Sequence, residues 1–216
     1  MLSAFATAWR EVKAIVLGLG AVLALGIWLR SPWLTLFAAL LLGWVFYFFR
    51  NPERVPDSTA AGAILAPADG RITAVERLEE PTFAGQPSWR ISIFLSLFDV
   101  HVQRSPCAGI VRLLRYRPGS FVPANSSQAH LNESNFIGLR TPYGRVGVVQ
   151  FAGILARRIV CWVSLGDKLA PGQRLGMIRF GSRVDLLLPI EAEVLVQVGQ
   201  QVYGGQTLVA RWPVPD

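Results

Sequence analysis

The 216-residue chain has little charge and few of the side chains that most enzymes use for catalysis or metal binding. Charged residues make up 16% of it, against about 25% in a typical soluble domain, and there are only two histidines and two cysteines. Two cysteines are too few for a disulfide framework in a chain of this length. The histidines and cysteines lack metal-ligand spacing, so we expect no metal site. With 52% hydrophobic residues, the chain does not have the composition of a disordered protein.

The glycine-rich motifs of nucleotide-binding folds and the GxSxG motif of serine hydrolases are also missing. The net charge is +7, but no nucleic-acid-binding motif accompanies it, so we expect no nucleic-acid partner. An anionic membrane surface is a better match for arginines without such a motif. The arginines suited to that contact are Arg112, Arg115, Arg117, Arg157 and Arg158.

The hydrophobic residues are concentrated near the N-terminus. Between residues 14 and 49, 28 of 36 residues are apolar and the only charged one is Arg30. Two uncharged runs, residues 14–29 and 33–49, predict a helical hairpin. As helices they would be about 24 and 26 Å long, slightly short of a 30 Å hydrocarbon core, and snorkelling arginines or local thinning would cover the difference. We therefore expect residues 1–54 to anchor the chain in the cell membrane, as a spanning or a re-entrant hairpin.

Basic residues on both flanks predict the orientation of this hairpin. Arg10 and Lys13 precede it and Arg50 and Arg54 follow it, which places both flanks and the rest of the chain on the cytoplasmic face. Two alternatives are a pair of buried helices in a soluble domain and a cleaved signal peptide. A signal peptide is disfavoured, because the first run leads directly into a second one instead of a small-residue cleavage site.

From residue 55 onward, short alternating strands replace the long apolar runs, and Gly, Pro, Asn and Asp separate them. Within this region Val163–Leu175 aligns with Val196–Leu208 at an offset of 33 residues, and both glycines are retained. Glycines at fixed spacing between apolar strands predict the same turn built twice, although such turns also recur by chance. We expect residues 55–216 to form a mainly β, barrel-sandwich-like domain similar to lipoyl and biotinyl carrier domains.

A glycine-serine pair, Gly181-Ser182, interrupts the apolar strand that leads to Pro189. Glycine inside a strand commonly marks a β-bulge or the close approach of another backbone. Alternatively, the Gly181–Ser182 bond is itself reactive, because Gly181 has no side chain to block attack of the Ser182 hydroxyl on its carbonyl carbon. The residues alone leave both interpretations open.

Five segments in a fixed order resemble a known family. They are FFRNPER at 48–54, APADG at 66–70, FLSLFDVH at 94–101, the stretch 150–161, and RFGSR at 179–183. Together they resemble phosphatidylserine decarboxylases of the short bacterial and archaeal type, over nearly the whole chain from residue 45 onward. Each motif is modest by itself, and their common order after an apolar N-terminal pair makes the resemblance specific.

The resemblance implies a proenzyme that cuts itself. Ser182 would attack the Gly181 carbonyl carbon, and elimination followed by hydrolysis would leave a covalent pyruvoyl cofactor at the start of a small subunit, residues 182–216. The large subunit would be residues 1–181. The pyruvoyl ketone would form a Schiff base with the phospholipid substrate and accept the electrons released with CO2. The implied reaction converts phosphatidylserine to phosphatidylethanolamine in phospholipid biosynthesis.

Self-cleavage needs a base near Ser182. Longer members of the family use an aspartate in Pro-x-Asp-Gly, which Asp69 matches, and the last histidine of Asp-x-His-x-x-His, where this chain has Arg104. We expect His101 to replace that histidine, oriented by Asp69 or Asp99, unless it is only a structural residue on a strand. Arg104 instead suits the substrate phosphate or carboxylate.

Two other classes of function stay open from the residues alone. A membrane-tethered, lipoyl- or biotinyl-like carrier or adaptor would need a modified lysine, and Lys168 is the candidate because the other lysine, Lys13, adjoins the hairpin. A phosphotransfer domain would use His101 or His130. The sequence does not decide the oligomeric state, and a homo-oligomer is compatible with it.

Overall fold

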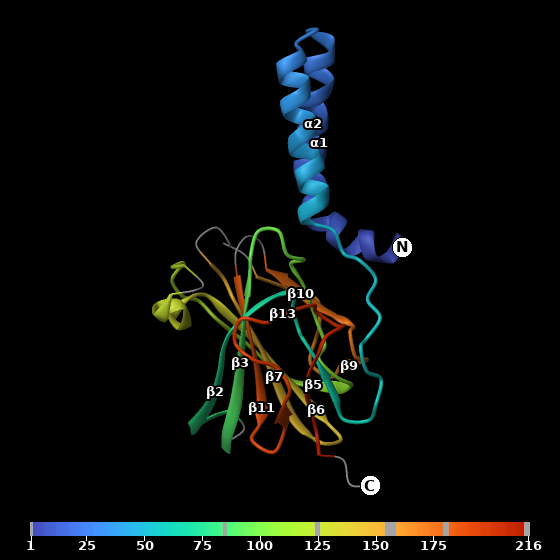
Figure 1. The fold of residues 1–216 in the computed structure, drawn as a ribbon. Coiled ribbons are helices and arrows are strands. Elements are labelled where there is room, and N and C mark those ends of the chain that lie inside the picture. The colour runs from blue at the N-terminus through green and yellow to red at the C-terminus, as the bar shows by residue number, and fades with distance from the viewer. Residues whose placement is uncertain (1, 84–85, 124–125, 154–158, 179–181, 214–216) are drawn as a thin grey trace. The chain divides into compact units, whose positions relative to one another are not determined.

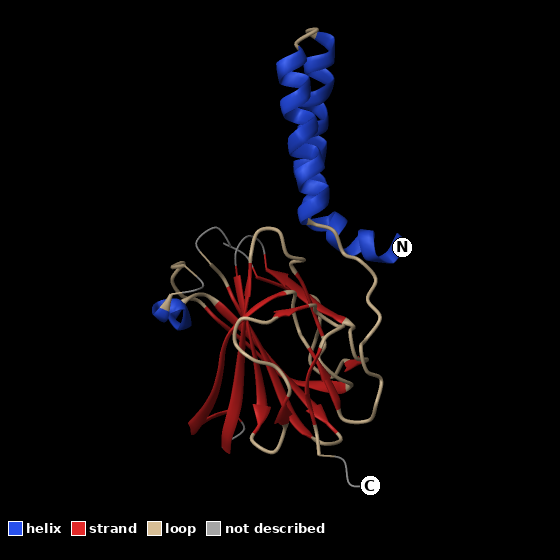
Figure 2. Cartoon of the chain, in the orientation of Figure 1, coloured by secondary structure: helices blue, strands red, loops and turns tan. Residues whose placement is uncertain are grey.

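The structure is a computed structural model that describes residues 2–83, 86–123, 126–153, 159–178 and 182–213. The chain divides into two compact units, residues 1–53 and 54–216. The regular structure of the first is helical, and that of the second consists of strands joined by loops, with one short 3-10 helix among the described residues (Figures 1 and 2). The predicted fold, mainly β with an N-terminal helical hairpin, is therefore confirmed.

The first unit consists of helix α1 (Leu2–Trp28) and helix α2 (Pro32–Phe48). Arg30 has a left-handed backbone conformation with φ of 51°, and Pro32 starts α2, so the chain reverses within three residues. Gly26 lets the helices approach closely, because a Cβ there would lie 2.8 Å from the Thr35 hydroxyl oxygen. Within the described part of the chain, neither helix combines the length and the hydropathy that crossing a membrane requires.

In the described residues of the second unit there are fourteen strands in three sheets. The largest sheet curls around the core and has the order β13-β2-β3-β11-β7-β6-β5-β9, and the two smaller sheets have the orders β1-β14-β12 and β4-β10-β8 (Figure 1). Their bounds are β1 Ala63–Leu65, β2 Gly70–Phe83, β3 Gln86–Leu95, β4 Val102–Arg104, β5 Gly109–Arg117, β6 Ser134–Thr141, β7 Gly144–Phe151, β8 Ile159–Cys161, β9 Lys168–Leu169, β10 Arg174–Ile178, β11 Ser182–Pro189, β12 Glu193–Val194, β13 Gln201–Val202 and β14 Leu208–Arg211; a short 3-10 helix, η1, covers Ser127–Leu131.

The predicted repeat is confirmed as the same turn built twice. Gly166 and Gly199 have φ of 92° and 91°, and Gly172 and Gly205 have φ of 73° and 72°. The N–H of Gly166 donates to a carbonyl of β5, and the N–H of Gly199 donates to a carbonyl of β2 in the same way. Only glycine adopts these conformations at little cost, which explains why these positions retained their identity.

The duplication extends beyond the repeat to the whole second unit. One half consists of β4–β10, and the other consists of β1–β3 with β11–β14, so the first half is inserted between β3 and β11. The order of the large sheet reads the same from either end when β13, β2, β3 and β11 are matched with β9, β5, β6 and β7. The register irregularity between Ile72 and Ala74 in β2 also has a counterpart between Val111 and Leu113 in β5. The two halves are therefore related by an approximate two-fold axis between β7 and β11.

Alternate side chains of the large sheet point into a shared hydrophobic core. On the central strands these are Val146 and Val148 of β7 and Val184 and Leu186 of β11, all fully buried. Because antiparallel neighbours reverse direction, β2 begins, β3 ends and β11 begins at one end of the sheet. Three aligned residues mark this end: Arg71, Phe94 and Arg183.

Candidate active site

Ser182 is the first residue of β11 and lies at the end of the sheet just described. It pairs with Leu95 of β3, and its side chain shares the core-facing side of β11 with Val184. The residue is completely buried, and its hydroxyl has no hydrogen-bond partner among the described residues. A buried hydroxyl without a partner costs about 1–3 kcal/mol, so such a group in a native site calls for a functional explanation. Gly181 lies outside the described residues.

The opposite side of β11 carries a tightly bonded ion pair. The Nε and one NH2 nitrogen of Arg183 donate to the two carboxylate oxygens of Asp185, at 2.7 and 2.6 Å, and the guanidinium lies 5.0 Å from the Phe151 ring centre. Burial alone would lower the pKa of Arg183, but the hydrogen bonds and the charge of Asp185 raise it. The residue next to Ser182 is therefore anchored by its side chain as well as by its backbone.

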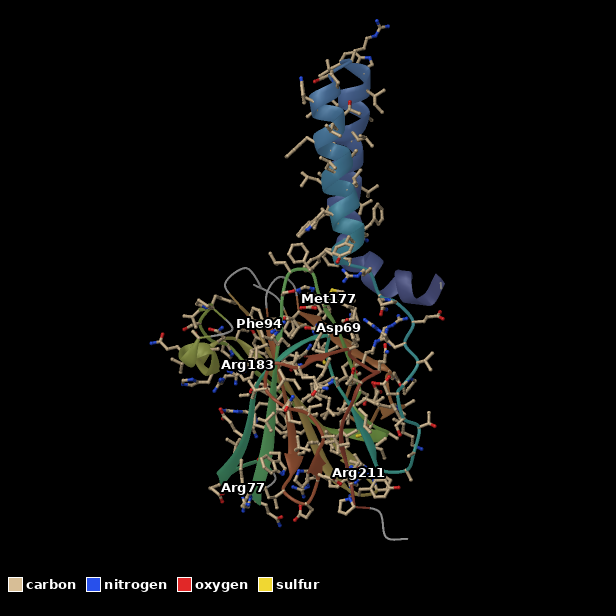
Figure 3. The ribbon with its side chains drawn as sticks, viewed as in Figure 1. Asp69, Arg77, Phe94, Met177, Arg183 and Arg211 are labelled. Carbon is tan, nitrogen blue, oxygen red and sulfur yellow. The ribbon has the colours of Figure 1, made fainter. Side chains whose placement is uncertain are left out.

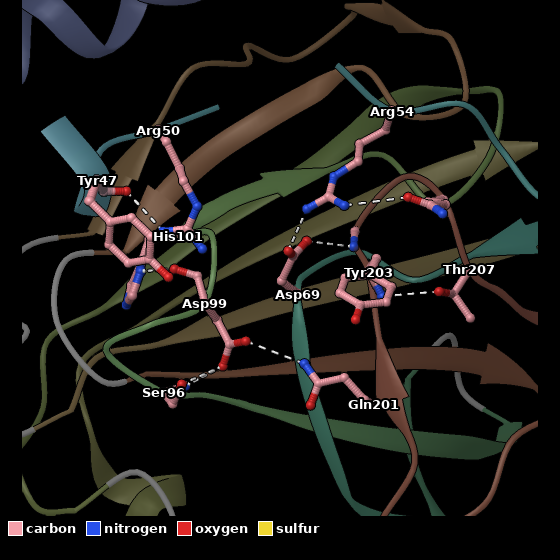
Figure 4. A network of polar contacts seen from close by, with 12 residues as sticks. Tyr47, Arg50, Arg54, Asp69, Ser96, Asp99, His101, Gln201, Tyr203 and Thr207 are labelled. Carbon is pink, nitrogen blue, oxygen red and sulfur yellow. Dashed lines mark hydrogen bonds and ion pairs between the residues drawn. The ribbon is translucent and has the colours of Figure 1, made fainter. Parts of the chain in front are cut away.

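His101 follows β3 on the turn that leads to β4, and it is completely buried. Its Nδ1 lies 2.9 Å from the carbonyl oxygen of Asp99. Because a carbonyl only accepts, we assign the proton of the neutral ring to Nδ1, which gives Nε2 the lone pair that a general base needs. The backbone of Asp99, rather than its carboxylate, makes this contact (Figure 4).

The Asp99 carboxylate holds the turn after β3 together. Its Oδ2 accepts hydrogen bonds from the backbone N–H of Ser96 at 2.8 Å and from the Ser96 hydroxyl at 2.7 Å. Its Oδ1 accepts a third, from the Gln201 amide at 3.3 Å. Asp99 therefore contacts His101 with its backbone and stabilises the turn with its carboxylate, and its role in orienting a base stays a prediction.

Asp69 immediately precedes β2, at the same end of the sheet, and is almost completely buried. One of its carboxylate oxygens pairs with Arg54 at 2.5 Å, and the other accepts the backbone N–H of Gly204 at 2.8 Å (Figure 4). Figure 3 shows Asp69, Phe94 and Arg183 toward one end of the unit and Arg77 and Arg211 toward the other. The structure thus gathers the predicted residues at one end of the sheet, whereas their chemical roles stay predictions.

Arg104 ends β4 and belongs to a small group of arginines around Asp69. One of its NH nitrogens donates to the carbonyl oxygen of Gly172 at 3.0 Å. Burial lowers the pKa of Arg104, and the nearby charges of Arg174 and Arg54 lower it further, while Asp69 raises it. A guanidinium fork is suited to bind a phosphate or a carboxylate, so the predicted contact of Arg104 with the substrate stays a prediction.

A chain of buried amides next to this site was not predicted from the sequence. The Asn135 amide donates to Gln150, Gln150 donates to Gln103, and Gln103 donates to the carbonyl oxygen of His101, each at 2.9 Å. Gln103 and Gln150 are completely buried. Gln150 lies opposite Val184, so it is a diagonal neighbour of Ser182 on the same face, about 7–8 Å away between Cα atoms.

The signal for this chain was present but weak. In the alternating segment Arg145–Phe151, Gln150 falls on the side of Val146 and Val148, where an apolar residue is expected. A polar residue on the core-facing side of a strand must find a partner, and the partners here come from β4 and β6. Asn135 lies on the strand that precedes β7, but Gln103 is 47 residues away from Gln150, which is why the pattern alone did not identify the chain.

Comparison with known proteins gives one consistent result. A family model described as phosphatidylserine decarboxylase matches residues 41–210. The phosphatidylserine decarboxylase proenzyme of Carboxydothermus hydrogenoformans is 48% identical over 206 residues, which cover 94% of this chain and 95% of that protein. The proenzyme of Symbiobacterium thermophilum is 45% identical, with 95% and 94% covered, and that of Gluconacetobacter diazotrophicus is 47% identical, with 85% and 84% covered.

Proposed function

The chain belongs to the phosphatidylserine decarboxylase family, and we propose that it converts phosphatidylserine to phosphatidylethanolamine with a pyruvoyl group made from its own Ser182. The observation that carries the proposal is the buried Ser182 hydroxyl, which has no partner among the described residues and lies beside the His101 turn. Membership of a decarboxylase family also replaces the carrier hypothesis, which depended on Lys168.

Self-cleavage would proceed through the atoms of the Gly181–Ser182 bond. The Ser182 oxygen attacks the Gly181 carbonyl carbon, its proton goes to the base, the C–N bond breaks, and an ester replaces the amide. Removal of the Ser182 α-proton then breaks the Cβ–O bond, which leaves a carboxylate on Gly181 and a dehydroalanine at 182. Water converts this group to a ketone and releases ammonia. A histidine with its lone pair on Nε2, as in His101, is suited to accept the first proton.

The residues present fit such a group, because it forms from the buried serine itself. When present, a pyruvoyl group supplies an electron sink for the decarboxylation. The fold holds the two subunits together after the cut: β11 of the small subunit lies between β3 and β7 of the large one, β13 pairs with β2, and β14 pairs with β1. We expect residues 182–216 to stay bound to residues 1–181.

We also propose that the helical unit associates with the cell membrane and that the catalytic unit acts on its cytoplasmic face. Large apolar side chains of both helices are exposed, including Leu17, Ile27, Trp33 and Leu40, each at least 62%. An aqueous environment disfavours such a surface, whereas lipid accommodates it. The basic residues that flank the hairpin favour the cytoplasmic face, where they would also be attracted to anionic lipid headgroups.

Mass spectrometry of the purified protein tests the function. We expect two fragments with a keto group at the start of the smaller one, together with decarboxylase activity; a single 23.7 kDa chain that is active would overturn the proposal. Ser182→Ala should stay uncut and inactive. Ser92→Ala is the matched control, since Ser92 is also buried and its hydroxyl also lacks a partner among the described residues, yet it lies on β3. His101→Ala should slow cleavage by about 10²–10⁴-fold.

A further inference from the structure

We propose that the catalytic unit docks on the phospholipid bilayer with the Ser182 end of its large sheet, and that Phe98, Phe121 and Leu131 enter the headgroup region. We call these three residues the docking rim. The inference rests on the proposed function in one respect only, which is that the substrate is a lipid of the bilayer.

The docking rim is built by connections on both sides of Ser182. Phe98 lies in the turn that follows β3, whose last residue Leu95 pairs with Ser182. Phe121 and Leu131 lie in the connection from β5 to β6, and β6 begins opposite the end of β7. Since β3, β11, β7 and β6 are successive neighbours, the two connections are about 14 Å apart, with β11 between them.

Hydrogen bonds hold the backbone of the docking rim, and its three large apolar side chains are exposed. The Asn132 side chain bonds both the N–H and the C=O of Val122 and the carbonyl of Ala152, and the Asp99 carboxylate holds the turn of Phe98. Nevertheless Phe98 is 68% exposed, Leu131 53% and Phe121 40%. Fixed, exposed, large apolar side chains around a reactive residue mark an interaction surface.

The charge beside the docking rim favours anionic lipid. Arg115 and Arg117 of β5 are exposed, and Arg117 donates to the carbonyl oxygen of His130 in η1, which fixes its position next to Leu131. Glu133, the acidic residue that immediately precedes β6, is buried. Each basic residue close to an anionic membrane contributes about 1 kcal/mol, so the apolar and the basic residues would act together.

Geometry selects the bilayer over another partner at this end. The acyl chains of the substrate stay in the bilayer, so only its short headgroup reaches the residue derived from Ser182. The opposite end of β11 is about 26 Å away, because the strand has eight residues at about 3.3 Å each. No phospholipid headgroup spans that distance, so the Ser182 end must face the bilayer during turnover.

Site-specific fluorescence on the full chain tests the docking surface. In a Cys161→Ser background, an environment-sensitive thiol probe is placed by Phe98→Cys, by Leu131→Cys, or by Leu165→Cys as the control. Leu165 is 63% exposed, and its neighbour Gly166 bonds to Val111, near the other end of the sheet. Burial raises the pKa of Cys107 to about 12, so that thiol should not react.

With vesicles of phosphatidylcholine and phosphatidylglycerol, neither of which is the substrate, we expect a blue shift at residues 98 and 131 and none at 165. Salt, or Arg115→Gln with Arg117→Gln, should weaken it. A shift of equal size at residue 165 would overturn the proposal. So would a shift that appears without vesicles and grows with protein concentration, because it would assign the docking rim to a second copy of the chain.

Activity gives a second, independent readout. We expect Phe98→Ser with Leu131→Ser to lower the ratio of activity on vesicles to activity on a water-soluble short-chain phosphatidylserine by about tenfold or more, whereas Leu165→Ser leaves it unchanged. An unchanged ratio in the double variant would contradict the docking surface. A chain that neither cuts itself nor decarboxylates either substrate would contradict the proposed function instead, and the fluorescence result would still decide the docking surface.

Discussion

The two halves of the β unit share one framework and differ where the chemistry is proposed. In the first half, β6 and β7 are joined by a tight hairpin whose last pair is Thr141 and Gly144. In the second half, the equivalent strands β3 and β11 end on the pair Leu95 and Ser182. There is no short turn at that point, because the whole first half is inserted between these strands. The proposed reactive serine therefore occupies the position of a hairpin glycine in the duplicate.

The side chains around Ser182 also differ from those at the corresponding positions of the first half. The β7 sequence Gly144-Arg-Val-Gly147 corresponds to Ser182-Arg-Val-Asp185 in β11, so a glycine stands where the second half has the carboxylate that pairs with Arg183. Conversely, the buried amides of Gln103 and Gln150, which lie toward Ser182, correspond to Ile64 and Leu188 at the other end. A common fold thus became asymmetric by placing buried polar groups at one end of the sheet.

The largest expected effect comes from breaking the ion pair that only the second half has. Asp185→Asn leaves the Arg183 charge buried without its partner, which should lower the free energy of unfolding by about 3–5 kcal/mol. Urea denaturation measures this, and Arg183→Gln combined with Asp185→Asn should recover much of the loss. Arg211→Gln is the matched control, because its pair with Glu193 is exposed and should contribute less than about 1 kcal/mol. Equal losses in the two single variants would contradict this assignment.

A smaller loss of stability is expected when a member of the buried amide chain is replaced by the residue at the corresponding position of the other half. Gln150→Leu installs the counterpart Leu188 but leaves the Gln103 oxygen and the Asn135 amide without their partner, which should cost about 1–3 kcal/mol. Gln103→Ile added to it removes one of the stranded groups, so the double variant should lose less than the sum. If the losses simply add, the amides do not act as a chain. Self-cleavage measured on the same variants shows whether the chain also positions His101.

The sequence predicted the fold class, the repeat turns and the candidate site residues, and the structure placed the described ones toward one end of the sheet. It did not reveal that the duplication includes the whole unit, because the strands need only apolar residues on one side and many sequences satisfy that. The two halves have kept identical residues at the repeat turns, because the positive φ there favours glycine. The partners of Asp69 and Asp99 could not be predicted either, since Gly204 and Gln201 lie more than a hundred residues away.

The smallest expected loss of stability comes from the repeat turns, and it tests the two-fold relation most strictly because it should be equal in both halves. Gly166 and Gly199 have matching φ, and a Cβ at either position would meet nothing within 4 Å. Gly166→Ala and Gly199→Ala should therefore each cost about 1–2 kcal/mol, entirely from the strained backbone. Thermal or urea unfolding of the two variants measures the costs. Gly205→Ala should cost more, because its Cβ would lie 2.6 Å from Arg104 Cδ. Unequal costs at residues 166 and 199 would mean that the two-fold relation of the backbone does not extend to its energetics.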